Sequence, residues 1–389
     1  MSKNALIFGA SGVTGWSFVN EMLHDYPKHN VWGKVHALTN RPLSLKQSQW
    51  PNDSRLNIVS GIDLLKGSQE ELEATMREKI QGIEDVTHVY YLAYKASTDL
   101  QKELEEAVAM WKRTVIAVDR LSKKLEFVVL QTGAKMYGCH LTTNHPTDYL
   151  HVPHKESQPR LQPPYHDLLF YHPQLDFITS YAASKPWTWI DTRPDIIIGF
   201  VPNQNFYSLG TVMGIYLSLW RAVHGAGSDC PFPGTQQSWT ALSNDSSSDM
   251  IARQTIHLSL TLDSSSKGEG YNVADERAPS SWSVKWPILC SYFGLQGTGP
   301  SEDPPEMRAF IKQNLGTWER LERERGLQTG HADSPMTFPG FERFLMTEFD
   351  FDRQYDMGKL YGTGFAEERG TGVAWGGVFD RMKGAGVIP

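Results

Sequence analysis

The chain has 389 residues, of which 40% are hydrophobic and 21% are charged, and its formal net charge is −7. This composition predicts a globular protein with room for two lobes around sizeable cores. An acidic balance without a long basic stretch argues against nucleic-acid and anionic-membrane partners. The sequence has no signal-peptide pattern and no apolar stretch of about 18 residues, and its cysteines lack metal-ligand spacing. We therefore expect a cytoplasmic protein with no membrane span and no metal site.

The first half of the chain alternates short apolar runs with amphipathic stretches. The apolar runs predict strands over 5–9, 35–38, 56–59, 87–93, 126–131 and 187–192. The stretches between them predict helices over 12–25, 68–80 and 97–122. In the last of these, the residues at helical spacing on one face are Leu104, Val108, Trp111, Val115 and Val118. Such alternation predicts an α/β fold of the Rossmann type, a doubly wound parallel sheet with helices on both faces.

Beyond about residue 200 the pattern becomes mostly helical. Helices are expected over 203–224, over 246–260 and over the charged amphipathic stretch 304–326. Ser246 or Ser248 is the expected N-cap of the second helix, and Gly326 the residue that stops the third. The tail from residue 358 is rich in glycine.

These patterns divide the chain into two parts. We expect a Rossmann domain over 1–205, to which a segment near 240–280 returns. The remainder, 206–389, is expected to form a smaller, mostly helical substrate-binding lobe. This lobe is expected over the carboxyl ends of the strands, because open α/β sheets bind ligands at that edge.

The segment "GASGVTG" (9–15) places three glycines between the first strand and the first helix. Gly9 allows the tight turn, Gly12 lets the backbone approach a pyrophosphate, and Gly15 lets the helix pack closely on the sheet. The helix N-terminus then offers N–H groups to the phosphates. The residues expected at this dinucleotide site are Gly9, Ser11, Gly12, Val13, Thr14 and Gly15. A purely structural turn between strand and helix is the alternative.

The end of the second strand predicts which dinucleotide binds. It carries Arg41 and no acidic residue before Asp53, so a 2′-phosphate is favoured over free ribose hydroxyls, and NADP(H) over NAD(H). A solvated loop arginine is the alternative for Arg41, and loop capping is the alternative to an adenine contact for Asp63. The other expected cofactor contacts are Thr39, Asn40, Arg41, Asp63, Ala93 and Thr132.

Lys135 follows the fifth strand, where it would reach the edge of the cofactor, and two tyrosines downstream could serve as acid or oxyanion donor. Tyr181 has the Tyr-x-x-x-Lys spacing that places both side chains on one helix face. However, the next strand begins six residues after Tyr181, and Pro186 ends the helix at Lys185. A tyrosine at the start of the helix needs most of a helix after it. The spacing therefore favours Tyr171 and makes Tyr181 a packing residue.

Seven segments in order resemble a known family. They are "GASGVTG", "DVTHVYYLAY", "LQTGAKMYG", "FYHPQLD", "TRPDIIIGF", "GYNVADE" and the terminal "VIP". The chain resembles the short-chain dehydrogenase/reductase superfamily and, within it, the progesterone 5β-reductase and iridoid synthase-like (PRISE) group. The resemblance implies that Lys135 and Tyr171 carry the chemistry. Gly133 stands where many short-chain dehydrogenases have a serine, which fits this group.

The implied reaction is the NADPH-dependent 1,4-reduction of an activated alkene, or reduction of a carbonyl, in a bulky apolar small molecule. Tyr171 would hold the developing oxyanion while Lys135 orients or charges the site. The residues expected along the substrate pocket are Tyr94, Tyr137 and His140, with Phe206 and Tyr207 as lid candidates. Where the family has "FYYD", this chain has "FYHP", so His172 is either an added acid–base group or a packing residue.

Two other functions remain open at this level. The first is a cyclase or isomerase of natural-product biosynthesis that keeps NADP(H) as a structural or electrostatic element without net redox chemistry. The second is a regulatory protein that senses NADP(H). For assembly, a homodimer is one option.

Overall fold

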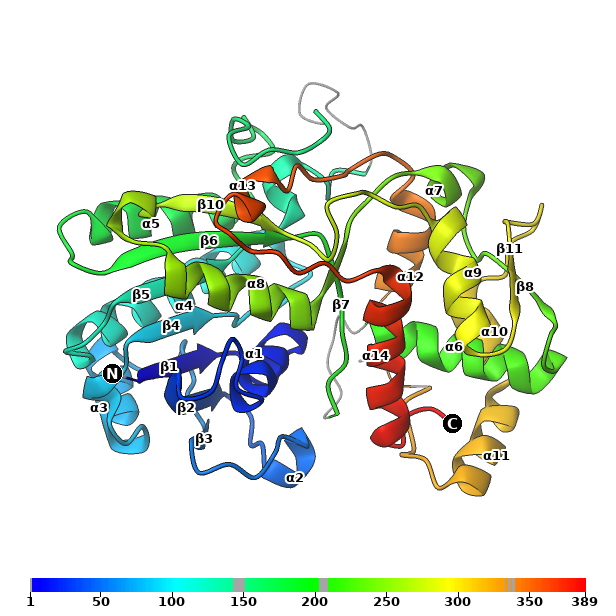
Figure 1. Ribbon diagram of the computed structural model, residues 1–389, viewed down its shortest axis with the longest axis horizontal. Coiled ribbons are helices and arrows are strands. Elements are labelled where there is room, and N and C mark those ends of the chain that lie inside the picture. The colour runs from blue at the N-terminus through cyan, green and yellow to red at the C-terminus, as the bar shows by residue number, and fades with distance from the viewer. Residues whose placement is uncertain (1, 143–150, 203–208, 333, 335–336, 338–339) are drawn as a thin grey trace.

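A parallel sheet forms the centre of the computed structural model, which describes residues 2–142, 151–202, 209–332, 334, 337 and 340–389 (Figure 1). Its seven strands run in the order β10-β6-β5-β4-β1-β2-β3. They are β1 (Lys3–Phe8), β2 (Trp32–Thr39), β3 (Leu56–Ser60), β4 (His88–Tyr91), β5 (Phe127–Gln131), β6 (Thr188–Pro194) and β10 (Glu269–Val273). The strand order reverses between β1 and β4, which in open α/β sheets marks the ligand-binding crevice. The predicted Rossmann-type fold is confirmed.

Helices cover both faces of this sheet (Figure 1). They are α1 (Val13–Leu23) and α8 (Ser248–Thr261) on one face, and α3 (Gln69–Lys79), α4 (Leu100–Leu121) and α5 (Tyr171–Ala182) on the other. Alternate residues of β1 face opposite sides, as a strand requires. Ala5 and Ile7 belong to the core beneath α1 and α8, whereas Leu6 and Phe8 belong to the core on the other side. The sheet is therefore buried on both faces.

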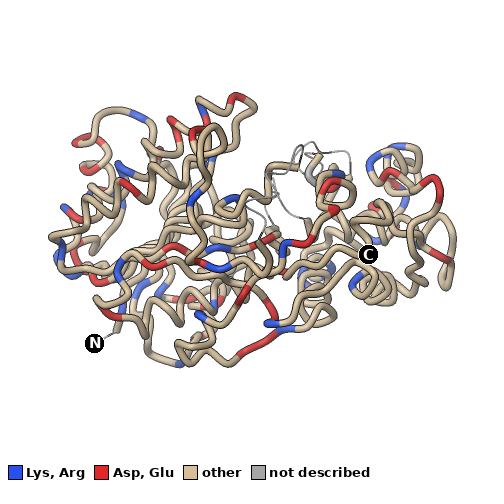
Figure 2. The backbone as a smooth tube through the Cα atoms, turned by 90° about the horizontal axis from the view of Figure 1, so that it is seen from above, with Lys and Arg blue, Asp and Glu red and all other residues tan. Residues whose placement is uncertain are grey.

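A second, mostly helical lobe has a core of its own, rich in tryptophan. Its longer elements are α6 (Leu209–His224), α9 (Trp282–Tyr292), α10 (Met307–Gln313), α11 (Leu315–Arg325), α14 (Thr371–Gly384) and the parallel pair β8 (Asp229–Pro231) and β11 (Gln296–Thr298). A second parallel pair, β7 (Ile196–Ile198) and β9 (Asp245–Ser247), lies between the sheet and this lobe. Figure 2 shows acidic and basic residues interspersed along both lobes.

The remaining elements are short. They are α2 (Leu45–Ser48), α7 (Gln236–Thr240), α12 (Phe341–Arg343), α13 (Gly358–Tyr361), the 3₁₀ helices η1 (Ile83–Asp85), η2 (Ala134–Tyr137) and η3 (Ser264–Ser266), and the π-helix η4 (Phe344–Glu348). Within the described ranges, none of the helices combines the length and the apolar character needed to cross a bilayer.

The buried face of α4 differs from the predicted one at the start of the helix. From Trp111 onward the predicted face is buried, whereas Leu104 and Val108 are only partly buried. Glu103 is buried in their place. The physical reason is a hydrogen bond from the Tyr94 hydroxyl to the Glu103 carboxylate, which turns this acidic side chain toward the loop after β4.

The charged stretch predicted as one helix over 304–326 is two helices, α10 and α11, which meet at Asn314. The Asn314 side-chain amide donates to the carbonyl oxygen of Phe310 at 2.8 Å. Such local bonding lets asparagine compete with the helical backbone pattern. Gly326 ends α11 in the left-handed conformation at φ 64°, as predicted.

One further expectation is corrected at the border of the helical lobe. The N-cap of α8 is Ser247, between the two predicted serines, and its N–H and hydroxyl both donate to Asp275 Oδ1. The glycine-rich tail contains the 14-residue helix α14. Residues 203–208 of the helix expected over 203–224 lie outside the described residues.

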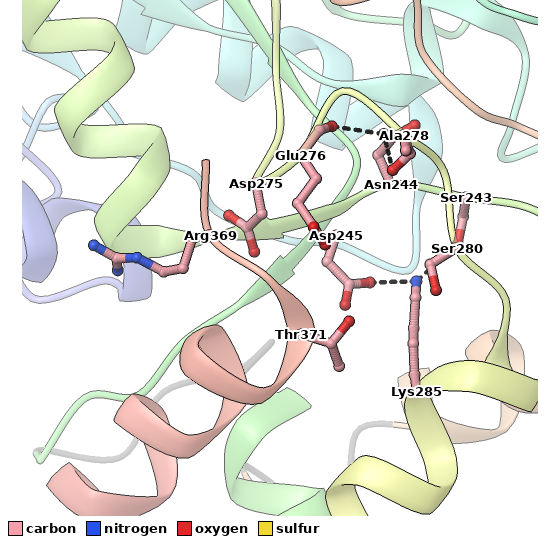
Figure 3. A pocket seen from close by; sticks show the side chains of 10 residues that line it. All are labelled: Ser243, Asn244, Asp245, Asp275, Glu276, Ala278, Ser280, Lys285, Arg369 and Thr371. Carbon is pink, nitrogen blue, oxygen red and sulfur yellow. Dashed lines mark hydrogen bonds and ion pairs between the residues drawn. The ribbon is translucent and has the colours of Figure 1, made fainter. Parts of the chain in front are cut away.

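A small polar pocket lies where the lobes meet (Figure 3). The residues that line it are Ser243, Asn244, Asp245, Asp275, Glu276, Ala278, Ser280, Lys285, Arg369 and Thr371. Lys285 Nζ lies 2.6 Å from Asp245 Oδ1. Asp275, a second acid of the pocket, is 2% exposed, and its Oδ2 has no hydrogen-bond partner among the described residues. Burial, reinforced by Asp245 and opposed by Ser247 and Arg369, raises the pKa of Asp275 to about 8.

The wild-type protein is predicted to lose stability as the pH rises, because Asp275 is buried. Asp275→Asn is predicted to abolish that loss. The carboxyl keeps its proton in the folded chain up to about pH 8, but has a pKa of about 3.9 when unfolded. Between these values the native state loses at most about 1.4 kcal/mol per pH unit. The advantage of the variant in Tm over the wild type should therefore grow from pH 5 to pH 8 in thermal unfolding. Asp303→Asn, in an exposed loop, is the control, and parallel curves for Asp275→Asn and the wild type would contradict the prediction.

Candidate active site

The turn between β1 and α1 needs glycine at two positions. Gly9 has φ +80°, and a Cβ atom there would lie 2.7 Å from the carbonyl oxygen of Leu92. A Cβ on Gly15 would lie 2.3 Å from the carbonyl oxygen of Gly9, so α1 can only approach the strand this closely with glycine. Gly12 is the N-cap of α1 and supplies no side chain to the N–H groups of the first turn. These groups and the cradle around them fit a pyrophosphate.

The start of α1 lies beside the end of β5. Gln131 Nε2 donates to the Thr14 hydroxyl at 3.3 Å, which joins the two elements at the carboxyl edge of the sheet. Val13, Thr14 and Gly15 are buried, whereas Ser11 and Gly12 are partly exposed at the turn. Ala93, just after β4, is packed against Gly9.

The loop after β2 leaves its cationic side chain exposed. The Thr39 hydroxyl donates to the Arg41 carbonyl oxygen at 2.7 Å and thereby fixes the loop. Asn40 and Arg41 are exposed, and within the described chain the Arg41 side chain has no hydrogen bond or ion pair. Asp63 accepts from the backbone N–H of Leu65 at 2.9 Å, which is a loop-capping contact.

Tyr171 and Lys135 lie at the same edge of the sheet. Tyr171 is the first residue of α5, and its hydroxyl is 3.5 Å from the position that a Cβ on Gly133 would take. Lys135 is on η2, directly after β5, with its Nζ 5.8 Å from the centre of the Phe170 ring. The same ring packs edge-on against Tyr171 at 4.7 Å. Burial lowers the pKa of Lys135, and the nearby Glu103 opposes this effect.

Tyr181 is in a separate cluster at the other end of α5. Its hydroxyl donates to Asp119 Oδ2 at 2.8 Å, and Lys185 Nζ binds the same oxygen at 2.7 Å. Trp187 Nε1 donates to the other carboxylate oxygen. Burial, with Asp119 beside it, raises the pKa of Tyr181 to about 12. The Tyr-x-x-x-Lys pair therefore binds one aspartate of α4.

A buried polar network lies beneath η2, and the sequence reasoning missed its central pair. Arg193 Nε donates to Asp191 Oδ2 at 2.7 Å, and the Thr132 hydroxyl donates to the same oxygen at 2.9 Å. Arg193 also reaches the Tyr137 hydroxyl, which donates to Asn272 Oδ1 at 2.6 Å. The available signal was "DTRP", which places two opposite charges inside an otherwise uncharged, buried strand. The hydroxyls of Thr132 and Tyr137, expected at cofactor and substrate, are engaged in this network.

Two histidines near the site, His140 and His172, have ring nitrogens that are buried. His172 is fully buried, its ring stacks on His166 at 4.5 Å, and neither ring nitrogen has a hydrogen-bond partner among the described residues. His140 Nδ1 is likewise buried without a partner in that part of the chain. Burial lowers the pKa of both His140 and His172 to about 4. His172 is thus a neutral packed side chain at pH 7. Phe206 and Tyr207 lie outside the described residues.

Residues 5–389 match the family described as the PRISE-like Rossmann-fold domain. The chain belongs to this family. Short chain dehydrogenase ausT of Aspergillus calidoustus is 36% identical, over 100% of this chain and 95% of that protein. The family membership and the name of this relative place the chain among oxidoreductases of the short-chain dehydrogenase type.

More distant relatives are also similar over nearly the whole chain. The 3-oxo-Delta(4,5)-steroid 5-beta-reductase of Arabidopsis thaliana is 27% identical, over 99% of this chain and 93% of that protein. The (S)-8-oxocitronellyl enol synthase ISY1 of Nepeta racemosa is 26% identical over the same shares. The UDP-glucose 4-epimerase of Thermus thermophilus, solved with NAD, has a TM-score of 0.59 at 16% identity, covering 98% of this chain and 99% of that one. This last likeness shows the fold.

Asp191→Asn is predicted to destabilise the PRISE-family chain strongly. Asp191 and Arg193 are 1% and 7% exposed, so the substitution leaves a buried guanidinium without its counter-charge. The expected loss is about 3–5 kcal/mol in the free energy of unfolding, measured by denaturant titration. Asp176→Asn removes the carboxylate of an exposed pair with Arg160 and should cost less than about 1 kcal/mol. Equal losses in the two variants would contradict the prediction.

Proposed function

We propose that this chain is an NADPH-dependent reductase of an activated carbon–carbon double bond, or of a carbonyl, in a bulky apolar small molecule. The observation that carries the proposal is the placement of Tyr171 and Lys135 around one Phe170 ring at the carboxyl edge of the sheet. The names of two relatives support it, since a 3-oxo-Δ4,5-steroid contains a carbon–carbon double bond conjugated to a carbonyl, and the other relative is an enol synthase.

The cofactor proposal rests on the cradle and on Arg41. The glycine turn has space for a pyrophosphate against the N-terminus of α1. The exposed Arg41 follows β2 where a ribose-binding acid is absent from the sequence, which favours a 2′-phosphate. When bound, the reduced nicotinamide would supply a hydride to the carbon β to the substrate carbonyl.

Tyr171 would bind the substrate carbonyl oxygen by donating its hydroxyl proton in a hydrogen bond. Negative charge develops on that oxygen as the enolate forms, so the hydrogen bond strengthens toward the transition state. The Lys135 ammonium adds positive charge in surroundings that are partly shielded from water, where its field acts more strongly than in solvent. Protonation at the α carbon from solvent then completes the reduction.

Tyr171→Phe is predicted to lower kcat by about 10²–10³, because one oxyanion donor is lost. The matched control is Tyr181→Phe, in the same helix, which loses only its bond to Asp119 and should retain activity. The measurement is NADPH oxidation by absorbance with a panel of cyclic and acyclic enones, alongside NADPH binding, which should stay unchanged. Full activity of Tyr171→Phe would contradict the assigned role. Product formed without NADPH consumption would favour the cyclase or isomerase alternative.

Arg41→Ala is predicted to weaken the binding of NADPH but not that of NADH. A hydrogen bond to a charged group contributes about 1.5–3 kcal/mol, so the Kd for NADPH should rise about tenfold or more. Fluorescence titration of both cofactors measures the effect. Arg323→Ala, which removes an exposed arginine of α11, controls for net charge. Equal weakening of both cofactors in Arg41→Ala would contradict the selection of a 2′-phosphate.

A further inference from the structure

Glu103 is a buried carboxylate next to the site, on the first turn of α4. Its residue is 6% exposed, and acidic side chains are almost never this buried without a partner. The Tyr94 hydroxyl donates a hydrogen bond to Glu103 Oε1. Among the described residues, no lysine, arginine or histidine forms an ion pair with Glu103, so this hydrogen bond alone does not balance its charge.

Two aromatic rings, Tyr94 and Phe170, join this carboxylate to the candidate catalytic groups. The Tyr94 ring stacks on Phe170 at 5.7 Å and 24°. Lys135 Nζ lies over the same Phe170 ring at 5.8 Å, and Tyr171 packs on its edge at 4.7 Å. Tyr94, which binds Glu103, therefore contacts the same Phe170 ring as Lys135 and Tyr171.

Lys135 is partly buried, and a cation in such a position is normally paired with an acid. In the described part of the chain its Nζ has no hydrogen bond or ion pair. Burial lowers the pKa of Lys135, and Glu103 is the acidic group that raises it. The other titratable groups described around the site are Tyr94, Tyr171, His140 and His172, and burial lowers the pKa of both histidines to about 4. Neutral tyrosine and histidine side chains supply no negative charge.

We propose that Glu103 is the positioning residue of Lys135. Its carboxylate, held by the Tyr94 hydroxyl, supplies the negative charge that keeps the Lys135 ammonium protonated beside Tyr171. This inference rests on the proposed reductase, in which Lys135 acts as a cation. A purely structural role, an acid that complements the N-terminus of α4, is the alternative. That helix end already has the Asp99 carboxylate, which accepts from the Lys102 N–H at 3.1 Å.

The first test measures Lys135 itself and needs no activity. Competitive acetylation of the intact protein between pH 7 and pH 11, followed by peptide mass spectrometry, gives the apparent pKa of Lys135. In Glu103→Gln, which keeps the acceptor for Tyr94, this pKa should fall by about one unit. Glu105→Gln removes an exposed charge from the same helix and should leave it unchanged. An unaltered Lys135 pKa in Glu103→Gln overturns the inference.

The second test uses the reaction. In Glu103→Gln the alkaline limb of kcat against pH should move down by the same amount as the Lys135 pKa, while the KM for NADPH stays constant. Glu103→Asp retains the charge and should restore most of the wild-type profile. Tyr94→Phe retains the carboxylate without its tether and should give a smaller shift, which covers the case that Glu103→Gln fails to fold.

The two tests separate the inference from the proposed function. If none of the tested substrates supports NADPH oxidation by the wild-type protein, the proposed reductase activity is overturned. The Lys135 titration then still decides the role of Glu103. A profile that is the same in Glu103→Gln and in wild type, with a lower Tm in the variant, would assign Glu103 to the helix end and overturn the inference.

Discussion

The buried ion pair of Asp191 and Arg193 is the interaction on which the sheet edge with the candidate site depends. Both residues come from β6. Asp191 accepts from Thr132 at the end of β5, and Arg193 donates to Tyr137 of η2, which in turn donates to Asn272 of β10. Asn272 extends the network, because its side-chain amide donates to the carbonyl oxygens of His154 and Asp356. The network thus joins several segments, and η2, which carries Lys135, is held through its Tyr137 hydroxyl. A buried ion pair tolerates little displacement, since separation leaves two desolvated charges.

The helical lobe is joined to this edge through α8. Asp249, in the first turn of α8, forms ion pairs with Arg369 at 3.3 Å and Arg381 at 2.8 Å, from the segment before α14 and from α14. The Ser17 hydroxyl of α1 donates to the same aspartate. The glycine-rich tail therefore contacts both α1 and α8, and a change in the position of α14 would reach α1 through one carboxylate.

Local sequence patterns predicted what depends on local physics. The strands, the helices of the first half and the glycine turn follow from apolar periodicity and backbone sterics, and the spacing after Tyr181 identified Tyr171 as the tyrosine at the start of α5. Side-chain contacts between segments far apart in the sequence have no comparable local pattern from which to predict them. Glu103 lies in the charged run "KELEE", where helical periodicity assigns Leu104 to the core. The burial of Glu103 is explained by its hydrogen bond from the Tyr94 hydroxyl, in the loop after β4. The break at Asn314 likewise depends on one side-chain amide.

The division of the tyrosine and the lysine between two elements has a physical consequence. When both lie four residues apart on one helix, the backbone fixes their distance. In this chain that spacing belongs to Tyr181 and Lys185, which are bound to Asp119. Tyr171 and Lys135 come from α5 and η2, so only tertiary contacts hold them together. An ammonium placed in this way beside aromatic rings loses hydration without gaining a helical partner, and its charge must be balanced by a third element. In this fold the acid available for that purpose is Glu103 of α4.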